Sequence, residues 1–219
     1  MGHIPHLVLA PGWSGGRITV DDGQRRHIAS VLRRVAGDPV TYTDGAGVTG
    51  SGTWTGAGVE RGDEQLVPQP SPRITLAVSP PDSKDRVRWL VEKSTELGIS
   101  RIRWLRSAYT QGRVPRHDKC VSWMIGAIEQ SRGAWLTDID EGWSTLHDLD
   151  GPWVAAQSGG TTPRLDRDMT VAIGPEGGWA PGELPEGVGR IHLGDRILRT
   201  ETAAVAVAVA AALGALRPS

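Results

Sequence analysis

The sequence predicts an α/β protein with two domains: a small β-barrel with one helix at residues 1–70, and a larger domain with a mainly parallel sheet at residues 73–219. From residue 73 onward, short apolar segments alternate with longer segments of helical spacing, a pattern that favours parallel strands covered by helices. Residues 1–72 contain short strand-like segments and turn signals instead. The boundary falls in the proline-rich stretch 67–72, which predicts a stiff, extended linker.

The first domain is predicted from short segments rich in apolar and β-branched residues. We expect strands at residues 7–9, 17–20 and 39–43 and around residues 52–54. The run Asp44-Gly45-Ala46-Gly47 is a strong turn signal after the third of them. Residues 27–35 have helical spacing, with four apolar residues on one face: Ile28, Val31, Leu32 and Val35.

The second domain is predicted from strands and helices that follow one another in turn. Helices are expected at residues 82–97, which end before Gly98, and at residues 121–135. Five short apolar segments predict the strands: residues 74–78, 102–105, 153–156, 170–173 and 190–193.

The last predicted helix, residues 203–213, has no charged residue. Its sequence AAVAVAVAAAL alternates as a strand would, but its length and alanine content favour a helix. Because it is apolar on every side, we expect it to be buried all round. A second subunit would complete that burial, and the alternative is burial within a single subunit.

Composition is that of a globular protein, with 38% hydrophobic and 22% charged residues. The single cysteine, Cys120, excludes an intrachain disulfide and fits a reducing compartment. The longest uncharged run, residues 202–216, is too short to span a bilayer, and no secretory signal opens the chain. His3 and His6 are joined by no cysteine or acidic cluster, so no metal site is expected. These features predict a cytoplasmic protein without a membrane span.

Charge is unevenly distributed, although the net charge is only −1. Residues 137–150 contain five acids and no lysine or arginine. Residues 99–119 contain one acid, Asp118, and six bases: Arg101, Arg103, Arg106, Arg113, Arg116 and Lys119. Two interpretations stay open for this basic stripe, contact with phosphates or a solvated face of mixed charge.

Two glycine-containing stretches each follow a predicted strand. The first is Ile173-Gly174-Pro175-Glu176-Gly177-Gly178-Trp179, and the second, residues 193–203, is LGDRILRTETA. Glycine permits backbone conformations and close approaches that a Cβ atom would forbid. Open α/β sheets bind ligands at such strand ends, so the two stretches predict a ligand cleft.

This pair of motifs closely resembles the C-terminal signature of the SPOUT, or α/β-knot, methyltransferases. Within that superfamily the chain is most similar to the family that methylates uridine N3 in 16S ribosomal RNA. The resemblance continues upstream through residues 92–99 (EKSTELGI) and 129–132 (EQSR), and it reaches the N-terminal region at His27, at residues 31–33 and at Asp44-Gly45. It therefore spans nearly the whole chain.

The resemblance implies a trefoil-knot methyltransferase domain preceded by a PUA-like, RNA-binding β-barrel. It implies a homodimer that forms through the knot and the C-terminal helix. It also implies S-adenosyl-L-methionine as the cofactor, held by Ile173, Gly174, Pro175, Glu176, Gly177, Gly178, Leu193, Gly194, Ile197, Leu198, Arg199, Thr202 and Ala203.

Methylation of uracil N3 requires removal of a weakly acidic N–H, so positioning and stabilisation of the developing anion can lower most of the barrier. Our candidate catalytic residues are Arg132, Arg199 and Glu201. Arg199 would steady the cofactor carboxylate or the uracil oxygens. Glu201, ionised at a helix start, would serve a cationic centre or pair with Arg199. A purely structural Arg199–Glu201 ion pair is the alternative.

Contacts to RNA are expected from His27, Arg33 and Arg34, although a packing role at the helix entry is equally compatible with His27. The chain departs from the family on the substrate side. Members commonly carry a further arginine after the segment matched by residues 129–132, where this chain has Gly133-Ala134-Trp135. Where members often have Ser-Glu-Arg, this chain has Ser107-Ala108-Tyr109. Arg132 would compensate for the missing arginine, and Trp135 would replace charge with stacking.

We therefore expect a homodimeric methyltransferase that acts on ribosomal RNA of the small subunit, at N3 of a uridine in 16S RNA. One alternative is the same fold with another RNA or a small molecule as acceptor. A second is a catalytically silent RNA-binding protein, against which the intact cofactor motif argues. The nucleotide, the general base and the choice between free RNA and assembled subunits are not set by the sequence.

Overall fold

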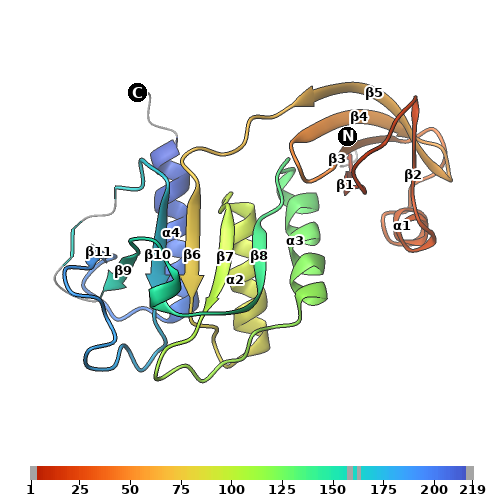
Figure 1. Ribbon diagram of the computed structural model, residues 1–219. Coiled ribbons are helices and arrows are strands. Elements are labelled where there is room, and N and C mark those ends of the chain that lie inside the picture. The colour runs from red at the N-terminus through yellow and green to blue at the C-terminus, as the bar shows by residue number, and fades with distance from the viewer. Residues whose placement is uncertain (1–3, 157–159, 162–163, 216–219) are drawn as a thin grey trace. The chain divides into compact units, whose positions relative to one another are not determined.

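The computed structural model describes residues 4–156, 160–161 and 164–215 (Figure 1). The chain divides into two compact units. The first comprises Met1–Gln69 together with Ile125–Leu136, and the second comprises Pro70–Met124 together with Thr137–Ser219. None of the helices in the described ranges is long and apolar enough to cross a membrane.

The second unit is built on a six-stranded parallel sheet in the order β11-β9-β10-β6-β7-β8 (Figure 1). Strands occur at all five expected places, so the prediction of a parallel α/β sheet is confirmed. Because every strand runs the same way, all their carboxyl ends lie at one edge of the sheet. The strands are β6 (Ile74–Val78), β7 (Arg101–Leu105), β8 (Asp138–Ser144), β9 (Trp153–Ala156), β10 (Met169–Ile173) and β11 (Gly189–His192).

Strand β8 is an addition to the predicted sheet. Its sequence DIDEGWS is acidic and mostly exposed, with only Ser144 buried. It pairs on one side only, with β7, and therefore forms an edge of the sheet. Edge strands tolerate charge and lack the apolar alternation by which buried strands are recognised, which explains the omission.

Two helices of the second unit pack together behind the sheet in Figure 1. Helix α2 (Lys84–Glu96) buries Val87, Leu90 and Val91 at helical spacing, and it ends before Gly98, whose φ is +76°. Helix α4 (Thr200–Ala215) packs against α2 and over β6 and β10. On a different part of the sheet, the core around Ala77, Leu105 and Ala172 includes the short helix η2 (Leu146–Asp148) and the loop residues Trp179, Leu184 and Val188.

Helix α4 is buried on one face only within this chain. Its buried residues follow helical spacing: Ala203, Ala204, Val207, Ala208 and Ala211. Val209 is 40% exposed and Leu213 is 60% exposed. The all-round burial predicted from composition is therefore not achieved by a single chain, which leaves an apolar face uncovered.

Helix α3 (His117–Ser131) lies four residues earlier than predicted. It begins shortly after Pro115, and Arg132 ends it in a left-handed conformation with φ of +62°. Trp135, expected in the helix, follows it, and its Nε1 donates a hydrogen bond to the Val67 carbonyl at 3.1 Å. The C-terminal part of α3, from Ile125 onward, belongs to the first unit.

The first unit is a curled five-stranded sheet in the order β1-β3-β4-β5-β2. Its pairings are antiparallel except for β1 with β3. One core holds it together, with Tyr42, Trp54 and Val59 almost fully buried. The long strand β5 was missed because its outer part is polar and exposed. The strands are β1 (His6–Val8), β2 (Arg17–Thr19), β3 (Pro39–Thr43), β4 (Val48–Trp54) and β5 (Gly58–Leu66).

The helical segment of the first unit starts earlier than predicted. Helix α1 (Asp22–Arg26) is capped by Asp21, whose carboxylate accepts from the Gln24 N–H at 2.7 Å. It continues as the π-helix η1 (His27–Val31). Of the four residues predicted to lie on one face, Ile28 is fully buried and Leu32 packs partly buried against the same core, whereas Val31 and Val35 are exposed. The wider π turn and the left-handed Arg33 (φ +52°) break the expected spacing.

Candidate functional site

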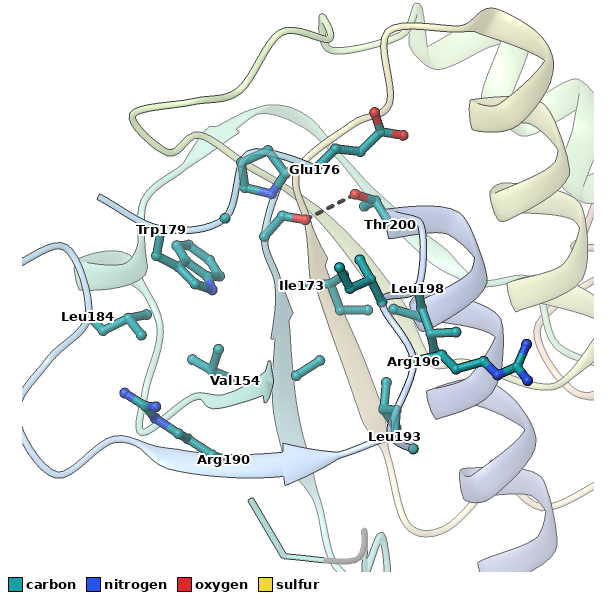
Figure 2. A pocket seen from close by; sticks show the side chains of 17 residues that line it. Val154, Ile173, Glu176, Trp179, Leu184, Arg190, Leu193, Arg196, Leu198 and Thr200 are labelled. Carbon is teal, nitrogen blue, oxygen red and sulfur yellow. Dashed lines mark hydrogen bonds between the residues drawn. The ribbon is translucent and has the colours of Figure 1, made fainter. Parts of the chain in front are cut away.

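A cavity of about 310 Å³ lies at the carboxyl ends of β9, β10 and β11 (Figure 2). The loop after β10 forms one wall, and the loop between β11 and α4 forms the other. Val154 and Ala155 of β9 also contribute. Its side chains are mostly apolar, and Figure 2 shows Ile173, Val154 and Trp179 facing the space between the two loops. This is the strand-end position at which open α/β sheets bind ligands.

The first loop requires glycine at two positions for two different reasons. A Cβ atom on Gly174 would lie 2.8 Å from the indole ring of Trp179, so the ring can pack on the backbone only at a glycine. Gly178 has φ of +75°, and its N–H donates to the Pro175 carbonyl at 2.9 Å, closing a tight turn. A Cβ on Gly178 would meet no atom of the protein within 4 Å. The backbone of Gly178 is thus open to the cavity that it lines.

The second loop is attached to the first at the start of α4. The buried hydroxyl of Thr200 donates a hydrogen bond to the Gly174 carbonyl at 3.0 Å (Figure 2). Gly194, with φ of +114°, turns the chain after β11. Leu193 and Leu198, both half-buried, then line the cavity. The two glycine motifs, separate in the sequence, therefore form one enclosure.

Beside the cavity, Arg86 of α2 gathers three carboxylates. Its guanidinium donates hydrogen bonds to Asp82 and to Glu176, and it lies 3.8 Å from the Glu201 carboxylate. The hydrogen bond to Glu176 is the main cause that raises the pKa of Arg86 above its ordinary value. Arg86 consequently stays charged, and it links α2 to both walls of the cavity.

Glu201 is 7% exposed and lies in the first turn of α4. Its Oε2 atom is buried and accepts no hydrogen bond. The expected pair between Glu201 and Arg199 does not form, because Glu201 points to Arg86 and Arg199 is exposed. Across the described ranges, no ion pair or hydrogen bond involves the Arg199 side chain.

The structure brings together ten of the thirteen residues predicted to bind the cofactor. Gly177 instead adjoins Tyr109, and Arg199 and Thr202 are exposed outside the lining. The ten that line the cavity are Ile173, Gly174, Pro175, Glu176, Gly178, Leu193, Gly194, Ile197, Leu198 and Ala203.

Seven lining residues were not predicted. Trp179, Arg196 and Thr200 lie within the two motifs, so the motifs themselves are the signal that could have found them. The other four depend on the order of strands and on the path of the loops, which periodicity does not reveal: Val154, Ala155, Leu184 and Arg190.

Arg132 belongs to the first unit, whereas the cavity belongs to the second. Its Nη2 donates to the Ile4 carbonyl at 2.9 Å. It lines a polar pocket with His6 and Glu64, among others. The His6 ring is within hydrogen-bond distance of Thr41 Oγ1 (2.9 Å) and of the Gly133 carbonyl (3.2 Å), and burial lowers the pKa of His6.

The three residues predicted to contact RNA also lie in the first unit. His27 and Arg33 are exposed, and Arg34 is half-buried. His27 is the C-cap of α1, and because its side chain is exposed, the packing role considered for it is not observed. No cluster of three potential metal ligands occurs in the part of the chain that the structure describes.

A parallel α/β sheet with an apolar cavity between two glycine loops at its strand ends defines a nucleotide-type cofactor site, as found in α/β methyltransferases. Residues 68–212 match the model of the family described as "RNA methyltransferase domain". The chain belongs to this family, and it is an RNA methyltransferase.

Individual relatives agree over most of the chain. It is 28% identical to ribosomal RNA small subunit methyltransferase E of Synechocystis sp., over 90% of this chain and 73% of the relative. Its sequence is 27% identical to that of ribosomal RNA small subunit methyltransferase E from Neisseria gonorrhoeae, whose crystal structure was solved bound to S-adenosyl methionine. The two structures agree with a TM-score of 0.80, over 95% of this chain and 96% of the other. A methyltransferase from Legionella pneumophila, in complex with the same cofactor, is 22% identical, with a TM-score of 0.82 over 95% and 96% of the chains, and shows the likeness of fold alone.

Proposed function

We propose that the protein uses S-adenosyl-L-methionine to methylate ribosomal RNA of the small subunit, at N3 of a uridine in 16S RNA. The observation that carries this proposal is the cavity between the two glycine loops, in a chain that belongs to an RNA methyltransferase family. The two relatives that are named ribosomal RNA small subunit methyltransferase E support the choice of acceptor.

The residues of the cavity fit this cofactor. Its volume of about 310 Å³ is within the range of small-molecule sites. An adenine ring can pack against the apolar side chains of Trp179, Leu193 and Leu198. The backbone groups of Gly178 and Gly194 are not covered by a side chain, so they are accessible for hydrogen bonds to the polar edge of the adenine. The cofactor supplies an electrophilic methyl group carried on a sulfonium.

The acceptor must present a nitrogen that has lost its proton. Deprotonated N3 shares its negative charge with the two uracil oxygens, so a cation near those oxygens lowers the barrier. We assign this role to Arg199, which is exposed next to the cavity residue Leu198 and engages no acid within the described chain. Glu201 acts indirectly, because it helps to hold Arg86, and Arg86 holds Glu176 at the cavity wall.

The first unit is assigned to RNA binding as a PUA-like module. Its exposed His27 and Arg33 and its half-buried Arg34 would contact the RNA backbone. Arg132, in the polar pocket of the same unit, is our candidate for a further contact needed during methyl transfer. It directly precedes Gly133, where members of the family commonly carry a further arginine.

Assembly follows from the uncovered face of α4. Val209 and Leu213 expose apolar surface on a helix that has no charge after Glu201 within its described length. We propose a homodimer in which this face packs against a second copy, and a trefoil knot formed by the two glycine loops. The protein would act in the cytoplasm, where ribosomal RNA is available.

Mapping of methylated nucleotides by mass spectrometry, in 16S RNA from cells with and without the gene, tests the acceptor. We expect one 3-methyluridine to disappear with the gene and to return when the purified protein and cofactor are added to the RNA or to the small subunits. A methyl group lost from another base or another RNA would favour the alternative acceptor. Calorimetry that detects no cofactor binding would favour a silent RNA-binding protein.

A further inference from the structure

Two further hollows of the second unit continue from the cofactor cavity. A small one shares Pro175, Glu176 and Thr200 with the cavity and is also lined by Tyr109. A larger one, of about 460 Å³, shares four residues with the small one: Pro81, Asp82, Gln111 and Gly112. The three hollows therefore adjoin one another, and we call the series from the cofactor cavity past Tyr109 to the larger hollow the track.

The larger hollow is basic. Lys84, Arg113, Arg116 and Lys119 line it together with the half-buried Trp123. Arg116 pairs with Asp118 at 2.7 Å, but the side chains of the other three cations form no ion pair with any described residue. The one acid in the lining, Asp82, is already bound to Arg86. Cations without counter-charges on a concave surface attract a polyanion.

The loop that carries Tyr109 is held firmly in place. The Oγ1 atom of Thr110 lies 2.8 Å from Ser79 Oγ and accepts from the Ser107 N–H at 2.9 Å. The Ala108 N–H donates to the Glu183 carboxylate at 2.9 Å. At the other end of the loop, Gly112 lies so close to the Pro80 carbonyl that any Cβ atom would collide with it.

Tyr109 is 48% exposed and lies at the narrow part of the track. A Cβ on Gly177 would be 3.2 Å from the Tyr109 Cβ, so the tyrosine rests against the glycine loop of the cofactor cavity. An exposed aromatic ring on a rigid loop is a platform on which a nucleobase stacks. Its position places that base beside the cavity.

We infer that this track binds the target RNA as a single strand, with Tyr109 stacking on a base at the reaction centre and Lys84, Arg113 and Lys119 binding phosphates of the adjoining nucleotides. This inference rests on the proposed function. The strand must be unpaired, because N3 of uracil lies on the edge used for base pairing and is inaccessible inside a duplex. Trp123 offers a second stacking surface within the basic hollow.

The basic hollow is tested by the double variant Arg113→Glu/Lys119→Glu. The matched control is Arg164→Glu/Arg167→Glu, an equal change of charge at two exposed residues that precede β10, at the opposite end of the strands from the cavity. Filter binding measures affinity for small subunits isolated from cells that lack the gene, and calorimetry measures cofactor affinity. We expect the hollow variant to bind subunits about tenfold or more weakly, with a shallower salt dependence, and the control to stay within about twofold of wild type. Both should bind the cofactor normally.

The stacking platform is tested by Tyr109→Ala against Tyr109→Phe. The alanine variant should lose about tenfold or more in single-turnover rate at saturating cofactor, whereas phenylalanine, which keeps the ring, should retain it. Equal rates for both variants and wild type would remove Tyr109 from the reaction centre.

The proposal that the track binds RNA is disproved if Arg113→Glu/Lys119→Glu binds small subunits as tightly as wild type does, or if the wild-type protein binds no subunits. These results differ from failure of the proposed function, which is judged by the identity of the methylated atom. The wild-type enzyme could methylate another position while the Arg113→Glu/Lys119→Glu variant no longer binds RNA. That result would refute the uridine N3 assignment and support RNA binding by the track.

Discussion

Two glycines, Gly178 and Gly194, line the cavity at positions where a side chain is poorly tolerated. Gly178 combines a left-handed φ of +75° with an empty Cβ direction, so a side chain there would project into the cavity that the residue lines. Gly194 has the same combination, with φ of +114°. At both positions a side chain would enter open space rather than the protein core.

We expect Gly178→Val to abolish cofactor binding while the protein stays folded. A β-branched residue at this φ costs about 1–3 kcal/mol, which a folded domain can tolerate. Gly182→Val is the matched control, because Gly182 has φ of +77° and an equally empty Cβ direction but does not line the cavity. Calorimetry with S-adenosylmethionine and circular dichroism on both variants make the comparison. Wild-type affinity in a folded Gly178→Val protein would exclude this loop from the site.

The pairing of Arg86 with Glu201 can be tested through stability. Arg86→Met leaves the buried Glu201 carboxylate without its cation, which should lower the free energy of unfolding by about 3 kcal/mol. Adding Glu201→Gln removes the uncompensated charge and should restore much of that loss. Denaturant unfolding of the two single variants and the double variant gives the coupling energy. Additive losses would mean that the two groups do not interact.

At the scale of elements, the sequence predicts the buried parts of the fold well and the exposed parts poorly. The apolar strands β6 and β10 stand out in the sequence, whereas the acidic edge strand β8 and the polar outer half of β5 do not. Helix α3 was placed too late because nothing in the periodicity marks the left-handed turn at Arg132. The Arg86 cluster was missed because it depends on α2 meeting loops about 90 residues away in the chain.

Helix α4 gives a test of assembly, because two neighbouring valines differ in exposure. Val209 is 40% exposed, so Val209→Glu should leave the chain folded and prevent dimer formation. Val207 is fully buried within the chain, and Val207→Glu should unfold the protein by burying an unpaired charge. Sedimentation velocity and circular dichroism distinguish these results. A stable dimer of the Val209→Glu protein would locate the subunit interface elsewhere.

At the scale of the whole molecule, binding of cofactor and methyl transfer should be separable. Arg132 lies in the first unit, so Arg132→Ala should leave cofactor affinity unchanged. If Arg132 contacts the RNA in the transition state, its loss should cost about 3 kcal/mol, or on the order of a hundredfold in single-turnover rate. Arg132→Lys, which keeps the charge, is the control and should lose less. An undiminished rate for Arg132→Ala would give Arg132 a structural role only.

The candidate site also has a part that the sequence predicts and a part that it does not. The residues predicted to bind the cofactor are adjacent in two short motifs, and ten of them line one cavity. Arg199 is exposed to solvent, and Arg132 donates a hydrogen bond to the Ile4 carbonyl. Neither environment leaves a pattern in the sequence. The hollow that contains Lys84 and Lys119 joins residues from two helices and two loops, which only the three-dimensional structure brings together.

The shared helix α3 has a consequence for the order in which the protein matures during translation. The β-strands of the first unit are complete at Leu66, yet Thr43 and Gly47 donate hydrogen bonds to Ala134, and Val8 donates to Glu129. Those partners leave the ribosome some sixty residues later, a delay of about 3–12 s at ordinary elongation rates. During that interval Thr43, Gly47 and Val8 of the nascent first unit lack these hydrogen-bond partners, while the first strands and helix of the second unit are made. The first unit therefore cannot be completed until part of the second unit has also been made, and a truncated chain that stops at residue 70 should be prone to aggregation.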